Sequence, residues 1–310
     1  MIRCTHRDVL PASLRGGVVA LGNFDGFHLG HQRVVAEAVE WARSEGRPAI
    51  VATFDPHPVR HFAPHVPPFR LTTLDQRQEL FAAAGADAML VFAFDAELAA
   101  MSAIDFVGEL LAARMGAAGV VTGQDFTFGQ GRGGSIATLA DEGARHGIAA
   151  RAVAPVTAAG LTVSSSRIRD ALKAGECEMA TALLTRPFAV RAQVQHGDKR
   201  GRTIGYPTAN MDMGAYLRPR YGIYAVMVRD IATGGAWQGA ANLGIRPQFD
   251  PPVELLEPFL FDFAGDLYGR ELEVELHHFL RPEAKFDTLD ALIAQMDEDC
   301  ARARTLLSAR

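Results

Sequence analysis

Two histidines, His28 and His31, close a glycine-containing string at the point where an apolar run, Val18–Leu21, gives way to a helical pattern, Val34–Trp41. A strand that turns through glycines into a helix directs backbone N–H groups and the positive end of the helix dipole at the turn, which favours phosphate. Three residues apart on a first helical turn, the two imidazoles share a face and can both donate to one phosphate group. Such a pair alone is more often a surface or metal-binding pair. The whole string, Gly-Asn-Phe-Asp-Gly-Phe-His-Leu-Gly-His, therefore predicts a nucleotide site.

Three further polar strings follow predicted strands in the same half of the chain. They are Thr53–Pro58, Gly123–Gly129 and Ser164–Arg169. In the last, hydroxyls at a helix N-terminus can cap free N–H groups or bind phosphate, and Arg169 offers a bidentate fork. Alternatively, this string is a plain helix cap, and the aspartate and histidine of the first are ordinary turn residues beside prolines.

A different string stands in the second half. Residues Gly197 to Asn210 read Gly-Asp-Lys-Arg-Gly-Arg-Thr-Ile-Gly-Tyr-Pro-Thr-Ala-Asn. Its glycines let the backbone approach phosphates, its basic side chains offset their charge, and Thr208 with Asn210 can offer neutral oxygens to Mg²⁺. A long hairpin turn is the alternative, which the Pro-Thr-Ala-Asn tetrad disfavours.

The elements that must position these strings change character along the chain. Apolar runs alternate with helical patterns up to about residue 184, which predicts βαβ units, a parallel sheet and ligands beyond the carboxyl ends of the strands. After Thr185–Pro187 the segments are strand-like and separated by turns, which predicts an antiparallel barrel, and only the tail has a long helical period. The expected strands are Val18–Leu21, Ala49–Phe54, Ala88–Phe92, Gly119–Thr122, Ile148–Ala154, Phe188–His196, Tyr221–Arg229, Ala236–Leu243, Leu256–Phe263 and Glu271–Phe279; the expected helices are Val34–Arg43, Leu74–Ala83, Ile104–Ala113, Ile136–Arg145 and Lys285–Leu307.

Length and composition agree with two globular domains. The chain has 310 residues, of which 48% are hydrophobic and 22% charged, and its formal net charge of −5 provides no basic field for nucleic acid. We expect neither a membrane segment nor a targeting segment, hence a cytoplasmic protein without an evident obligate protein partner. The cysteines Cys4, Cys177 and Cys300 are too far apart for a disulfide framework or a clustered zinc site.

These strings also resemble known families. The string ending at His31 resembles the HxGH signature of nucleotidyltransferases, and all four first-half strings resemble the adenylyltransferase module of bacterial FAD synthetases. The Pro-Thr-Ala-Asn string resembles riboflavin kinases. The resemblance covers nearly the whole chain and implies an α/β nucleotidyltransferase domain, Rossmann-like with a parallel sheet, over residues 1–184, and a β-barrel kinase domain with a C-terminal helix over residues 185–310. It implies a bifunctional riboflavin kinase and FMN adenylyltransferase that phosphorylates riboflavin to FMN and adenylylates FMN to FAD and pyrophosphate, with ATP as co-substrate and Mg²⁺ as cofactor.

The resemblance also assigns roles to residues. Those in catalytic roles are His28, His31, Arg169 and Glu257. Those that bind nucleotide or substrate are Gly22, Asn23, Phe24, Asp25, His57, Asp125, Ser164, Ser165, Ser166, Gly197, Lys199, Gly201, Arg202, Gly205, Pro207, Thr208 and Asn210, with Thr208 and Asn210 also holding the metal. The family usually has threonine where Ser166 stands, a change that keeps the hydroxyl.

The kinase base lies where the chain departs from the family. Glu257 matches the family's glutamate, while Phe259 replaces the usual histidine and Gln248 the usual threonine after an Arg-Pro pair. Pro258 lacks a ladder N–H, so the strand should begin there or lie at an edge. Glu254 is a rival base, which strand alternation places on the opposite face from Glu257.

Two alternatives remain open at this point. A single-activity nucleotidyltransferase for another phosphorylated substrate explains the first string but not the Pro-Thr-Ala-Asn segment. A flavin-binding or regulatory module with one degenerate activity explains both halves and tolerates Phe259.

Overall fold

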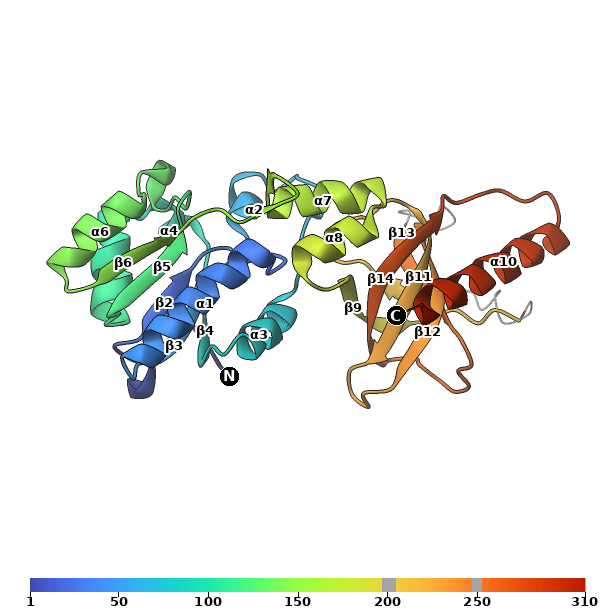
Figure 1. The fold of residues 1–310 in the computed structure, drawn as a ribbon, viewed down its shortest axis with the longest axis horizontal. Helices are drawn as coiled ribbons and strands as arrows, with labels where there is room; N and C mark the ends of the chain where they lie inside the picture. Colours follow the sequence, from blue (N-terminus) through green and yellow to red (C-terminus); the bar gives the residue numbers. More distant parts are fainter. Residues whose placement is uncertain (197–204, 247–252, 310) are drawn as a thin grey trace. The chain divides into compact units, whose positions relative to one another are not determined.

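The computed structural model describes residues 1–196, 205–246 and 253–309 and separates into two compact units (Figure 1). Unit 1 comprises Met1–Val66 and Thr72–Ser164, and unit 2 comprises Pro67–Leu71 and Ser165–Arg310. Four predicted phosphate-loop residues and one family departure lie outside the described residues: Gly197, Lys199, Gly201, Arg202 and Gln248. Within the described ranges, no helix is long and apolar enough to span a membrane.

Unit 1 contains a six-stranded sheet, in which all neighbouring strands are parallel. The strand order is β1-β4-β3-β2-β5-β6. The strands are β1 Ile2–Thr5, β2 Val18–Leu21, β3 Ala49–Asp55, β4 Ala88–Ala93, β5 Gly119–Gly123 and β6 Ala149–Val153. The helices are α1 Leu29–Ser44, α2 Pro58–Phe62, α3 Leu74–Ala83, α4 Ala96–Ala100, α5 Ala103–Asp105 with the π-helical η2 Phe106–Arg114, and α6 Ile136–Arg145, with short 3₁₀ turns at η1 Ala12–Leu14 and η3 Gln130–Arg132. The predicted parallel α/β fold is confirmed.

Alternating side chains of the strands build a core on each face of this sheet, as a parallel sheet covered on both sides requires. On β2, Val18 packs with one cluster and Val19 with the other. Helices α1 and α3 contribute Val35 and Phe81 to the first cluster, and the opposite face is covered by η2 and α6 with side chains such as Leu139.

Unit 2 is a closed antiparallel barrel preceded by two helices and followed by a third, as Figure 1 shows. Its strand order is β10-β13-β12-β11-β14-β9. The helices are α7 Ser165–Ala174, α8 Cys177–Leu184 and α10 Leu289–Ser308; the barrel strands are β9 Phe188–Gln195, β10 Asn210–Asp212, β11 Gly222–Asp230, β12 Ala236–Arg246, β13 Val253–Leu260 and β14 Glu271–Arg281. A two-stranded hairpin, β7 Thr157–Ala158 with β8 Leu161–Thr162, completes unit 1. The predicted barrel with its C-terminal helix is confirmed.

One local expectation about this barrel is wrong, because β13 does not begin at Pro258 and is not an edge strand: it pairs with β10 on one side and β12 on the other. The strand continues through Pro258, which pairs with Ala241 of β12. In an antiparallel ladder the nitrogen and the carbonyl of one residue point to the same neighbour. The Pro258 carbonyl accepts the Ala209 N–H at 2.9 Å, so the missing N–H faces the short β10 side and leaves the β12 ladder intact.

Candidate functional sites

The turn after β2 is a left-handed segment locked by aromatic side chains. Phe24, Gly26 and Phe27 have φ values of 49°, 86° and 44°. Each non-glycine residue in this region costs on the order of 1 kcal/mol or more. Packing offsets that strain, because both phenylalanines are buried and their rings lie 5.8 Å and 5.1 Å from the ring of Phe81 on α3. A Cβ at Gly22 would approach the Phe24 ring to 3.1 Å, so the first glycine of the string also belongs to this packing.

The two histidines of the string lie side by side at the start of α1. Their rings stack with centroids 3.6 Å apart and planes 18° apart. His28 is the N-cap of the helix, and its Nδ1 accepts the His31 backbone N–H at an N···N distance of 3.4 Å. Because Nδ1 accepts this bond, the neutral ring carries its proton on Nε2, which becomes the donor nitrogen.

The polar residues between Gly22 and the histidines point in different directions. The buried Asp25 carboxylate accepts the Thr72 N–H at 3.0 Å, and the Gly26 N–H donates to the Thr72 hydroxyl at 2.9 Å. Asp25 therefore fixes the turn to the segment before α3. Within the described residues, Oδ1 of Asn23 is buried and has no hydrogen-bond partner, as expected of a group kept for a ligand.

The other predicted residues of unit 1 stand at the carboxyl end of the sheet. His57 follows β3 and caps α2, its Nδ1 accepting the Val59 N–H at 3.2 Å. Asp125 is exposed just after β5. Ser164 is the last residue of unit 1.

The serine–arginine string is divided between the two units. Helix α7 begins at Ser165, so Ser165, Ser166 and Arg169 belong to unit 2, where Arg169 Nε donates to the Phe69 carbonyl at 2.8 Å. The guanidinium also lies over the Phe69 ring, 5.1 Å from its centroid. That Arg169 joins the histidines at one phosphate stays a prediction.

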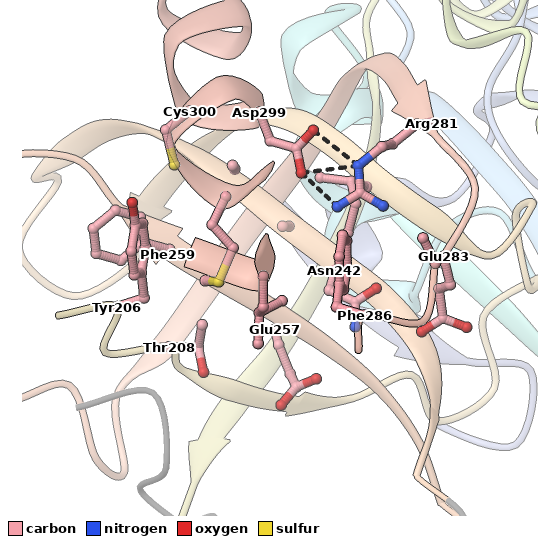
Figure 2. A pocket seen from close by; sticks show the side chains of 16 residues that line it. Tyr206, Thr208, Asn242, Glu257, Phe259, Arg281, Glu283, Phe286, Asp299 and Cys300 are labelled. Atoms are coloured by element: carbon pink, nitrogen blue, oxygen red, sulfur yellow. Dashed lines mark hydrogen bonds and ion pairs between the residues drawn. The ribbon is translucent and has the colours of Figure 1, made fainter. Parts of the chain in front are cut away.

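A cavity of about 330 Å³ opens beside the barrel, between the outer face of β12 and β13 and helix α10 (Figure 2). Thr208 and Glu257 both line it, and Figure 2 shows them at its lower side. Asn242, the cross-strand partner of Glu257, lines it too, and its Oδ1 is buried without a hydrogen-bond partner among the described residues. The cavity lining is Tyr206, Thr208, Ile223, Ala240, Ala241, Asn242, Glu257, Phe259, Arg281, Glu283, Ala284, Phe286, Leu292, Met296, Asp299 and Cys300.

The two candidate bases of β13 have different surroundings. Glu257 lines the cavity, whereas Glu254 accepts Arg218 Nε at 2.6 Å and the Tyr221 hydroxyl. Burial would raise the pKa of the Glu254 carboxyl, but the hydrogen bonds from Tyr221 and Arg218 outweigh it and lower that pKa. Glu257 lines the cavity and Glu254 does not, so the position of the two side chains favours Glu257 as the candidate base.

Sequence reasoning did not find the residues that close this cavity. Arg281 forms a bidentate ion pair with the buried Asp299 of α10, with Nη2 and Oδ2 2.7 Å apart. The Tyr206 hydroxyl donates to Asp297 of α10, and its ring lies 5.0 Å from that of Phe259. Nothing in the sequence indicates that Arg281 pairs with a carboxylate 18 residues later.

The remaining residues of the Pro-Thr-Ala-Asn string are placed around the barrel strands. Thr208 bridges to Phe259, and Asn210 begins β10 opposite Gln195 of β9. Pro207 is exposed, as is Gly205, which has a φ of 86°. Asn210 is absent from the cavity lining, so its shared role with Thr208 stays a prediction.

In the described parts of the chain, no group of three or more His, Cys, Asp or Glu side chains could hold a metal ion. The cavity instead offers the Thr208 hydroxyl, the Asn242 amide oxygen and the Glu257 carboxylate. Oxygen donors of this kind suit Mg²⁺, which keeps several waters and shares substrate phosphates rather than filling an all-protein cage. The residues present fit that ion.

Two family sequence models and several curated relatives match this chain. The FAD synthetase model matches residues 10–167, and the riboflavin kinase model matches residues 184–307. A bifunctional riboflavin kinase/FMN adenylyltransferase from Pseudomonas fluorescens is 40% identical over 99% of this chain and 97% of its own length. The protein of the same name from Escherichia coli strain K12 is 36% identical over 98% of this chain and 96% of its own length.

A solved structure has the same fold. It is a Streptococcus pneumoniae protein described as a macrolide-efflux protein, with a TM-score of 0.86 and 30% identity, covering 96% of this chain and 97% of that one. The similarity therefore extends over both units.

Proposed function

This chain belongs to the bifunctional riboflavin kinase/FMN adenylyltransferase family, and we propose that it carries out the two reactions at the two sites described above. Residues 1–184 would hold the adenylyltransferase and residues 185–310 the kinase. The observation that carries the kinase assignment is that Thr208 and Glu257, distant in sequence, line one cavity. The stacked histidine pair carries the adenylyltransferase assignment.

In the kinase reaction, Glu257 accepts the proton of the ribityl 5′-hydroxyl while that oxygen attacks the γ-phosphorus of ATP and the bond to the β-phosphate breaks. A positioned base supplies a factor on the order of a hundred or more. Bound Mg²⁺ would be held through Thr208, which lines the cavity, and by prediction through Asn210, which lies outside its lining; the ion would offset charge on the nucleotide phosphates. The aromatic wall of Tyr206 and Phe259 supplies an apolar surface suited to a flavin ring.

In the adenylyl transfer, a phosphate oxygen of FMN attacks the α-phosphorus of ATP and pyrophosphate leaves. That phosphate is already an anion near neutral pH, so a general base is not required. His28 and His31 donate to the phosphoryl oxygens as charge develops, and Arg169 assists them. The side-chain NH2 of Asn23 and the Ser165 hydroxyl would add neutral donors, and Ser164 and Ser166 belong to the same proposed binding set.

The experiment is incubation of the purified chain with riboflavin, ATP and Mg²⁺ followed by chromatography. We expect FMN to appear first and FAD to follow. FMN without FAD would show that the first unit is degenerate. If neither FMN nor FAD appears, the chain is instead a flavin-binding or regulatory module. Conversion of supplied FMN to FAD, without phosphorylation of riboflavin, would contradict the role of the Glu257 cavity.

The cellular location is a lesser part of the same proposal. All three cysteines are free thiols, which supports a reducing compartment such as the cytoplasm.

A further inference from the structure

We propose that Arg77 of α3 is a positioning residue for adenylyl transfer and acts through Asn23. The inference rests on the proposed assignment of adenylyl transfer to unit 1. Arg77 has no place in the motifs of that site, and it lies on the helix that follows β3 rather than on the turn that holds the histidines. Its side chain nevertheless reaches the turn.

The Arg77 guanidinium joins the ends of two neighbouring strands. Its side chain is 4% exposed. Nη1 donates to the Thr53 hydroxyl at 2.8 Å and to the Asn23 carbonyl at 3.2 Å, while Nη2 lies 3.5 Å from Oδ1 of Asp55. Thr53 and Asp55 belong to the end of β3, and Asn23 comes two residues after β2. The Arg77 guanidinium therefore joins the end of β3 to the turn after β2, and both segments carry predicted substrate contacts.

The hydrogen bonds around Asn23 close into a triangle. The Thr53 hydroxyl donates to the Asn23 carbonyl at 2.8 Å and accepts from Arg77, which donates to the same carbonyl. Two donors thus fix the backbone of Asn23. The Oδ1 of its side chain is buried and has no hydrogen-bond partner in the described part of the chain. The backbone is held and the amide is kept for a ligand, as preorganisation of a contact residue requires.

The geometry calls for arginine in particular. A guanidinium is a rigid fork whose N–H groups diverge, so one side chain can serve the hydroxyl, the carbonyl and the carboxylate together. A lysine at this position keeps the charge but offers a single nitrogen. Burial of an ionised group costs free energy unless the group is well paired. A buried arginine is therefore unexpected on a helix face that has no role beyond packing.

The turn does not depend on Arg77 alone for its fold. Phe24 and Phe27 pack on Phe81, and Asp25 is bonded to Thr72. Replacing Arg77 should therefore leave the turn folded while its Asn23 carbonyl loses a donor. A displacement of about 1 Å at a contact residue can lower turnover by as much as a hundredfold.

The test is a double-mutant cycle in the full-length chain, with FAD formation from supplied FMN as the readout. We expect Arg77→Gln to lower kcat at least tenfold with little change in the KM for ATP, and Arg77→Lys to recover part of the loss. In an Asn23→Ala background, the same Arg77→Gln change should alter kcat less than threefold, since the residue it positions is gone. Riboflavin phosphorylation should stay at the wild-type rate. Arg47→Gln, which removes an exposed guanidinium of unit 1 that pairs with Glu45, is the matched control and should change neither activity.

Losses that multiply in the double variant, or an Arg77→Gln chain with wild-type kcat, would overturn the proposal. If Arg77→Gln loses its cooperative melt, Arg77→Lys takes its place in the cycle with the same criterion. An Asn23→Ala chain with full activity would also overturn it, and would place the error in the role of Asn23. A wild-type chain that makes FMN but no FAD would instead refute the proposed function of unit 1.

Discussion

Glu257 on β13 and Asn242 on β12 are direct cross-strand partners, and both side chains line the same cavity. Residues directly opposite on an antiparallel pair point to the same face, so the register alone places an amide beside the carboxylate. The Asn242 oxygen is buried and without a hydrogen-bond partner among the described residues. The barrel thus presents a carboxylate together with a neutral acceptor, on paired strands rather than on a loop.

This arrangement makes Glu257 the residue on which riboflavin phosphorylation should depend most. Glu257→Gln keeps the shape of the side chain but cannot accept the proton of the ribityl hydroxyl. We expect turnover to fall about a hundredfold or more at saturating riboflavin and Mg-ATP, measured as FMN formation. Conversion of supplied FMN to FAD should be unchanged.

Glu254→Gln is the matched control three residues away on the same strand. Its carboxylate is held by Arg218 and Tyr221 and lies outside the cavity lining, so turnover should change little. A larger loss of turnover at Glu254 than at Glu257 would contradict the assignment of Glu257 as the base. It would also contradict the inference that Phe259 stands where the family usually has histidine.

Cys300 offers a chemical probe of the same cavity. Burial, with a contribution from nearby carboxylates, raises the pKa of its thiol to about 11. The reactive thiolate is therefore scarce at pH 7.5 and increases as pH rises toward that pKa. Iodoacetamide labelling of Cys300, followed by peptide mass spectrometry, should be slow at pH 7.5 and accelerate at pH 9.

Riboflavin should slow this labelling, because Cys300 lines the cavity. Cys4 and Cys177 are buried in the folded chain, which makes them internal controls for unfolding. Equal labelling of Cys300 with and without saturating riboflavin would contradict flavin binding in this cavity.

The compact units suggest how the chain should be divided. Helix α8 packs against β9 and β14, and its Leu183 and Leu184 are buried. A fragment of residues 185–310 should fold and make FMN, but a fragment of residues 165–310 should melt at a higher temperature because it keeps that apolar contact. The converse fragment, residues 1–184, should convert supplied FMN to FAD. Calorimetry compares the two barrel fragments, and equal melting temperatures would show that α8 adds nothing to the stability of the barrel.

The sequence predicted most of the longer helices and strands because their hydrophobic periods are strong. Helices α3 and α6, for example, have the predicted bounds. Among the strands of the sheet and the barrel it missed β1 and β10, and it also missed α2, α4, α8 and the β7–β8 hairpin. β1 is a mostly exposed edge strand that pairs with β4, and β10 is three residues long and begins at the last residue of a turn-like string. Both exist because of a partner strand distant in sequence, which local periodicity does not show.

The site shows the same limit. Motif strings predicted that the histidines stand where a strand turns into a helix. The family resemblance singled out Thr208 and Glu257 as site residues. Neither the strings nor the resemblance predicted Arg77, which has the position of an ordinary helix residue, or the pairing of Arg281 with Asp299. Those contacts depend on how α3 and α10 pack in three dimensions, and neither helix carries a sequence signal for it.

The central claim is that one chain performs two reactions at two separate sites. The most direct measurement is a time course of FMN and FAD from riboflavin, ATP and Mg²⁺, comparing the wild-type chain with His28→Ala and His31→Ala. Loss of a charge-stabilising donor should lower FAD formation by about a hundredfold or more, while FMN accumulates at nearly the wild-type rate. Equal loss of both products in a variant that keeps its cooperative melt would contradict the account.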